Sequence, residues 1–219
     1  MLLVWSRSAI AQLDINLQTL SGHPFGVITH EFDLVSFLAE RKASNDVPGT
    51  SPIEELEDLL DRHRLMIFRN QTQLTSAQQV SFGTLFGKLH LQSSDPNRAD
   101  DPTMDPRIAV FSNNPDKGVV NVGVEGFHVD GNVARTLHRY TMIYCEEPVD
   151  GGDTLFSPLN EVLQVLLSQD LVDDSGQLLD WQRVLFRSAH VSTNIHPLIY
   201  PHPSTGLDTM LVALGTLSA

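Results

Sequence analysis

The chain has 219 residues, of which 41% are hydrophobic and 19% charged, a balance typical of a globular domain with a real core rather than a disordered chain. Its formal net charge of −13 argues against nucleic acid or an anionic membrane surface as a partner, because both require clusters of lysine and arginine. No apolar run approaches the ~20 residues of a membrane span, and a single cysteine excludes an internal disulfide, so a reducing, cytoplasmic location is expected.

The first part of the chain alternates between extended and helical patterns. Residues 1–23 follow no clear pattern and are predicted to form a variable leader, followed by one domain over residues 24–219. Residues 24–30 indicate an early strand and residues 32–43 a short helix. Residues 44–50 are rich in turn-forming side chains and predict a loop.

A second helix has a well-marked beginning. Ser51 is suited to the N-cap, Pro52 to the first helical position, and Glu54 completes a capping box. The helical spacing places one set of apolar side chains on a common face: Ile53, Leu56, Leu59 and Leu60.

The segment that follows this helix predicts a strand, a third helix and a loop. The apolar run 65–68 is short enough for a strand, which we expect to be buried on both faces. Thr75 and Gln78 form a capping box that opens a helix through Phe86. Residues 93–107 are rich in proline and aspartate and predict a loop.

The second half of the chain is predicted to be mostly strand. Short apolar runs indicate strands at residues 108–111, 119–124, 140–145, 153–156, 195–200 and 209–214. Cys145 lies in one of these runs and is expected to be a buried strand thiol. A helix opening at Ser157 and Pro158 has an apolar side formed by Leu159, Val162, Leu163, Leu166 and Leu167. Short strands after a helical front predict a mainly β, α+β fold: a jelly roll, or double-stranded β-helix, with N-terminal helices.

His128 and Asp130 form the most informative pair in the chain. In an extended segment, side chains two residues apart point to the same face, so an imidazole and a carboxylate converge. These are two of the three ligands in the 2-His-1-carboxylate site of non-haem Fe(II) oxygenases. A mixed nitrogen and oxygen site suits Fe(II) better than structural zinc. The alternative is a surface histidine and aspartate in a turn that ends at Gly131.

The residues around this pair resemble the TauD/TfdA family, the taurine and 2,4-dichlorophenoxyacetate dioxygenases. The segments that carry the resemblance follow the family order: residues 64–71, 74–79, 86–90, 127–131, 151–156 and 196–206. The resemblance implies a double-stranded β-helix and an enzyme that uses Fe(II), 2-oxoglutarate and O2. It also implies that His128 and Asp130 bind the iron, that 2-oxoglutarate is decarboxylated to succinate, and that a small organic substrate is hydroxylated.

Three further positions take their expected roles from the resemblance. The hydroxyl of Thr154 falls where the family binds a carboxylate of 2-oxoglutarate; the alternative is an ordinary strand threonine. Gln92 falls where taurine-specific members carry a histidine that contacts the sulfonate, and Val124 falls where they carry a polar contact residue. Both departures predict a substrate other than taurine.

The family's distal iron-binding histidine and its 2-oxoglutarate-binding arginine follow the segment that residues 196–206 resemble. Neither is found in the 219 residues, so we expect the domain to be incomplete at its C-terminus. Three histidines precede that point, and the resemblance implies that they do not bind the iron but have structural roles or support the residues that do: His190, His196 and His202.

Two functions are therefore open. The first is the dioxygenase of the family, and the second is a catalytically inactive member that acts as a binding or regulatory module. If the strands that close the jelly roll are missing, an open sheet edge would favour self-association, so homo-oligomers are expected.

Overall fold

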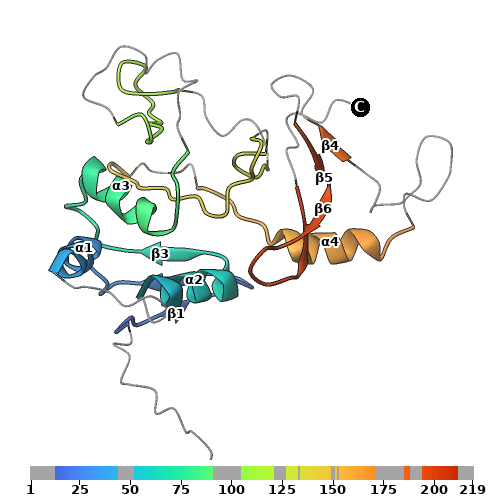
Figure 1. Cartoon of the computed structure of the whole chain (residues 1–219), viewed down its shortest axis with the longest axis horizontal. Helices are drawn as coiled ribbons and strands as arrows, with labels where there is room; N and C mark the ends of the chain where they lie inside the picture. Colours follow the sequence, from blue (N-terminus) through green and yellow to red (C-terminus); the bar gives the residue numbers. More distant parts are fainter. Residues whose placement is uncertain are drawn as a thin grey trace, which may run out of the picture. The chain divides into compact units, whose positions relative to one another are not determined.

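The computed structural model describes residues 13–43, 52–90, 105–120, 127–132, 134–148, 151, 153–170, 185–187 and 194–211. The chain divides into two compact units, Met1–Ala109 and Val110–Ala219, and Figure 1 labels most of their elements. Each unit has its own buried apolar side chains. In the described parts of the chain, no helix is long and apolar enough to cross a membrane.

A three-stranded sheet organises the first unit. Its order is β1 (Gln18–Thr19), β2 (Val27–Thr29) and β3 (Met66–Phe68), with β1 antiparallel to β2 and β2 parallel to β3. Parallel neighbours need a long crossover connection, and here α1 (Leu34–Ala43) and α2 (Pro52–His63) lie between β2 and β3 along the chain. The predicted strand at residues 24–30 and the predicted helix at residues 32–43 are thus confirmed.

Strand β1 lies in a segment where the sequence predicted no element. Gln18 pairs with Ile28, and Thr19 pairs with Val27. Nearby, the backbone N–H of Leu13 donates to Oε2 of Glu55 over 2.9 Å. Residues before position 23 therefore contribute to the sheet and contact helix α2.

The helices of the first unit follow their local signals closely. α2 begins at Pro52 and buries Ile53, Leu56 and Leu59, while Ser51, its predicted N-cap, lies outside the described residues. α3 (Ser76–Leu85) has the predicted capping box: the Thr75 side chain accepts from the backbone of Gln78, and the Thr75 N–H donates to Oε1 of Gln78 over 2.9 Å. Both helix predictions are confirmed.

An aromatic cluster joins the helices to the sheet. Phe82 of α3 contacts Phe37 of α1, Phe68 of β3 and Phe86, and Phe32 contacts Phe37 and Phe68, with ring centroids 5.2–6.3 Å apart. Such tilted and edge-to-face pairs add to the free energy of burial. All three residues of β3 are only half-buried, so the expectation of burial on both faces was wrong. The sheet order explains this, because β3 is an edge strand.

The second unit contains one described helix and two strand pairs. β4 (Leu185–Arg187) is antiparallel to β5 (Ile195–Pro197), and β6 (Ile199–Pro201) is antiparallel to β7 (Asp208–Met210). Helix α4 (Leu159–Leu167) packs on β7, where Leu163 is completely buried beside Met210. The predicted helix is confirmed. The strand predicted at residues 195–200 forms two strands, β5 and β6, and of the strand predicted at residues 209–214 only 209 and 210 belong to β7, while residues 212–214 lie outside the described residues. Strand β4 was not predicted.

Other predictions for this unit differ from the structure. Described residues 140–145 and 153–156 form no strand, and between residues 108 and 120 the structure has only a single bridge, between Phe111 and Val119. An apolar run becomes a strand only where a partner supplies ladder hydrogen bonds, and no described segment pairs with these two runs. Cys145, which was expected to be a buried strand thiol, is exposed. Leu167, which was expected on the apolar side of α4, is 45% exposed.

The predicted jelly roll is not confirmed by the described elements. Helices and strands are both present, as expected for α+β. However, the described strands form one three-stranded sheet and two two-stranded sheets.

Candidate metal site

The segment that carries His128 and Asp130 is anchored by the residue between them. Val129 packs against the completely buried Leu211, in a cluster (the Leu211 cluster) that also contains Leu137, Leu198 and Tyr200. His128 and Asp130 flank Val129, and their side chains are 44% and 46% exposed. One inward apolar side chain therefore holds a short segment whose two polar neighbours remain accessible.

The two polar side chains meet. Nε2 of His128 lies 3.2 Å from Oδ1 of Asp130. Two ligands at neighbouring corners of an octahedral shell, each about 2.1 Å from the metal, are about 3.0 Å apart. The donor set and its spacing therefore fit a divalent metal such as Fe(II), although a simple hydrogen-bonded ion pair has the same separation. Within the described residues, no group of three or more His, Cys, Asp or Glu side chains is close enough to hold a metal.

The backbone turns immediately after this pair. The N–H of Asn132 donates to the carbonyl of Val129 over 3.3 Å, and the N–H of Ala134 donates to the carbonyl of Gly131 over 2.9 Å. Gly131 has φ +70°, and a Cβ added there would lie 2.6 Å from Cγ of the His138 ring. The turn thus requires glycine for two reasons, its left-handed backbone and the close approach of an imidazole.

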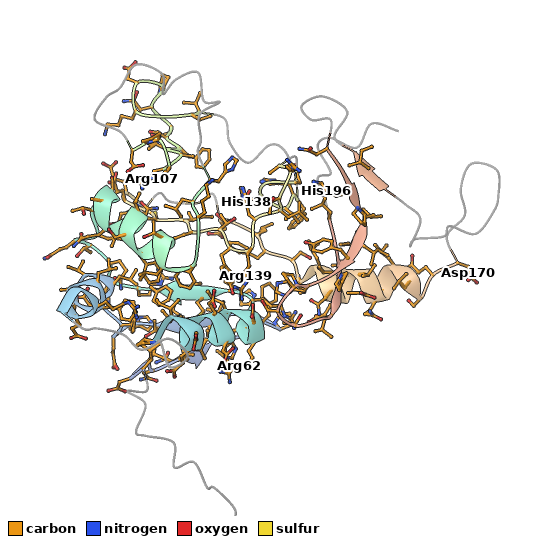
Figure 2. The ribbon with its side chains drawn as sticks, viewed as in Figure 1. Arg62, Arg107, His138, Arg139, Asp170 and His196 are labelled. Atoms are coloured by element: carbon orange, nitrogen blue, oxygen red, sulfur yellow. The ribbon has the colours of Figure 1, made fainter. Side chains whose placement is uncertain are left out.

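Two hydrogen bonds tie this region to distant parts of the same unit. Nε2 of His196, on β5, lies 2.8 Å from the carbonyl oxygen of Ala134. Nη2 of Arg139 donates to Oγ of Ser204, between β6 and β7, over 2.8 Å. Figure 2 labels His138, Arg139 and His196 among the side chains of this unit. The sequence analysis missed both ties, because neither leaves a local signal in the sequence.

The histidines that precede the family's distal segment show no convergence on the pair in the described contacts. His196 contacts Ala134, and Nδ1 of His202 accepts from the backbone N–H of Thr205 over 3.4 Å. His190 lies outside the described residues. The two described contacts are structural in kind, as expected from the sequence.

The Leu211 cluster provides an apolar environment for the phenol of Tyr200. Burial raises the pKa of the Tyr200 phenol above its ordinary value of 10.0. Tyr200 is therefore neutral near pH 7 and contributes packing rather than charge beneath Val129.

The remaining predicted site residues are not brought to the pair by any described contact. Thr154 is exposed and lies in a non-strand segment before α4. Gln92 and Val124 lie outside the described residues. Their assignments stay predictions.

Comparison with protein families identifies the class. Residues 35–216 match the family described as "Taurine catabolism dioxygenase TauD, TfdA family". The chain belongs to this family, as its motifs predicted; the family is known for dioxygenases that use Fe(II), 2-oxoglutarate and O2, and it implies a double-stranded β-helix. A search of curated proteins gave no match.

Proposed function

We propose that this protein is an Fe(II)- and 2-oxoglutarate-dependent dioxygenase that hydroxylates a small organic substrate on a double-stranded β-helix frame. One observation carries the proposal. In a chain that belongs to the TauD/TfdA family, Nε2 of His128 and Oδ1 of Asp130 lie 3.2 Å apart on a turn anchored by Val129.

The proposed roles follow from the chemistry of the side chains. His128 would supply a neutral nitrogen donor and Asp130 an anionic oxygen donor, a combination suited to Fe(II). When bound, the iron supplies O2 activation coupled to the decarboxylation of 2-oxoglutarate to succinate. Thr154 would donate a hydrogen bond from its hydroxyl to a carboxylate of 2-oxoglutarate, an interaction strengthened by the charge of the acceptor.

The proposed substrate is a small molecule other than taurine. Compared with the histidine of taurine-specific members, Gln92 keeps hydrogen-bonding capacity but cannot carry a positive charge. Val124 offers no polar contact at all. A sulfonate would therefore lose the possible positive charge at position 92 and the polar contact at position 124.

Metal binding by the full-length protein tests the proposed site. We expect this form, with Fe(II) and 2-oxoglutarate added under anaerobic conditions, to give a visible metal-to-ligand charge-transfer band. His128→Ala and Asp130→Ala should abolish the band, whereas the matched control His202→Ala should retain it, because the described hydrogen bond of the His202 ring is to Thr205 in its own turn. A band of unchanged intensity in both ligand variants would show that the pair does not bind the metal.

Turnover separates the dioxygenase from the alternative, a binding or regulatory module. Succinate formation that depends on Fe(II) and 2-oxoglutarate would establish the dioxygenase. Metal binding through His128 and Asp130 without succinate would favour the binding module. Efficient turnover driven by taurine would overturn the proposed roles of Gln92 and Val124.

A further inference from the structure

We propose that His196 is a positioning residue that holds the backbone of the candidate metal site in its ligand-presenting form. This inference rests on the proposed function and deepens it. His196 belongs to β5, and its ring reaches Ala134, 62 residues earlier in the chain, with Nε2 2.8 Å from the carbonyl oxygen.

This contact determines which nitrogen of the His196 ring carries a hydrogen. A backbone carbonyl can only accept a hydrogen bond, so Nε2 of His196 must carry the proton and donate it. An Nε2 that carries a proton has no lone pair for a metal. His196 therefore acts on the site through Ala134 and not as the third ligand through this nitrogen.

Ala134 connects His196 to the turn that follows the proposed ligands. Its carbonyl accepts from His196, and its N–H donates to the carbonyl of Gly131 over 2.9 Å. Gly131 directly follows Asp130 and is confined further by the His138 ring, which would lie 2.6 Å from any Cβ at this position. Two successive hydrogen bonds, between His196 and Ala134 and between Ala134 and Gly131, therefore connect β5 to the residue that follows Asp130.

The exposure of the ligands explains why such a constraint matters. The side chains of His128 and Asp130 are 44% and 46% exposed, so a large part of each is not covered by packing. Their placement depends on the backbone, which Val129 anchors from the Leu211 cluster and which His196 holds at the far end of the turn. Metal ligands must be held within about 0.5 Å of the productive geometry by supporting contacts. Ligands that are displaced by about 1 Å therefore bind the metal poorly.

Three substitutions at one position isolate the hydrogen bond. His196→Gln places an amide nitrogen the same number of bonds from Cα as Nε2, whereas His196→Asn places it one bond short, and His196→Ala removes the donor. We expect affinity for Mn(II) or Fe(II) to fall about 10-fold in the Ala and Asn variants, and to recover to near the wild-type value in the Gln variant. His202→Ala is the matched control and should bind as the wild type does.

A second readout needs no metal. Hydrogen exchange at the amides of residues 127–137 should be faster in the Ala and Asn variants than in the wild type and the Gln variant. Circular dichroism verifies that each variant is folded, and if the Ala variant does not fold, the comparison of Gln with Asn decides.

The outcomes separate this inference from the proposed function. If the wild type shows no metal binding that depends on His128, the proposed function fails, and the positioning role fails with it. If the wild type binds metal through His128 but the Ala and Asn variants keep full affinity and slow exchange, only the role of His196 is wrong. Equal losses in the folded Gln and Ala variants would also overturn it, because the Nε2 donor would then be irrelevant.

Discussion

The two units of the chain differ in how far they bury their described apolar side chains. In the described residues of the first unit no large hydrophobic side chain is exposed, whereas the second unit exposes several, among them Leu155 at 72% and Ile143 at 68%. The first unit is built around an aromatic cluster that links two helices to a strand. The second relies on two small clusters, around Leu163 and around Leu211.

The difference shows where packing and proposed chemistry reside. The candidate metal site lies in the unit that exposes more of its described apolar side chains, where Val129 packs on the Leu211 cluster and long-range hydrogen bonds join the region to β5 and to Ser204. Segments that bind ligands often come from the less stable parts of a protein. The geometry of the candidate metal site therefore depends on individual contacts rather than on a large core.

The largest effect is expected at an almost completely buried position of the first unit. Leu56 of α2 is 1% exposed, so Leu56→Ala should destabilise the protein by about 2–5 kcal/mol through lost burial and a residual cavity. Leu207 of the second unit is 59% exposed, and Leu207→Ala should change stability by less than about 0.5 kcal/mol. Urea denaturation measures both. Similar losses of unfolding free energy in the two variants would contradict the difference in burial between Leu56 and Leu207.

A glycine substitution tests how tightly the candidate site is constrained. Gly131→Ala introduces left-handed strain and a Cβ 2.6 Å from the His138 ring, together about 2–4 kcal/mol, and should weaken metal binding. Gly206 has a similar φ of +68° but nothing within 4 Å of an added Cβ, so Gly206→Ala should show the backbone strain alone, about 1–2 kcal/mol. Thermal unfolding compares the pair. Equal shifts in Tm would mean that His138 does not confine the turn.

A smaller, stabilising effect is expected in the core of the first unit. Thr29 of β2 is 1% exposed, and its Oγ1 has no hydrogen-bond partner among the described residues. Thr29→Val replaces this buried hydroxyl with a methyl group of similar size and should stabilise the protein by about 1 kcal/mol. Thr19→Val, at an exposed position of β1, serves as the control and should be nearly neutral. A destabilised Thr29→Val would show that the hydroxyl has a partner.

The smallest effect is a pH dependence in the second unit. Burial raises the pKa of Tyr200 above 10.0, so the unfolded chain releases this proton at a lower pH than the folded chain. The contribution to stability is complete below pH 10.0 and declines as the pH rises through and above this value. Tyr200→Phe should remove that decline, which denaturant unfolding at pH 9 to 11 would detect; an unchanged slope would contradict the assignment to Tyr200.

The sequence was most informative where the determining interactions are local. The capping box of Thr75 and Gln78, the start of α2 at Pro52 and the apolar side of α4 each depend on residues within a few positions of one another. The spacing of His128 and Asp130 is equally local, and their side chains do meet. Family membership was also readable from the motifs in their order.

Pairing and long-range contacts were decided by the tertiary structure. Residues 140–145 are as apolar as a strand yet pair with no described segment, while the unpredicted strand β4 pairs with β5. Likewise, nothing near position 134 in the sequence predicts that its carbonyl meets His196, 62 residues later. Local spacing alone could place two donors side by side, but only the folded chain could bring β5 and the Leu211 cluster to the turn, because those contacts join residues that the sequence keeps far apart.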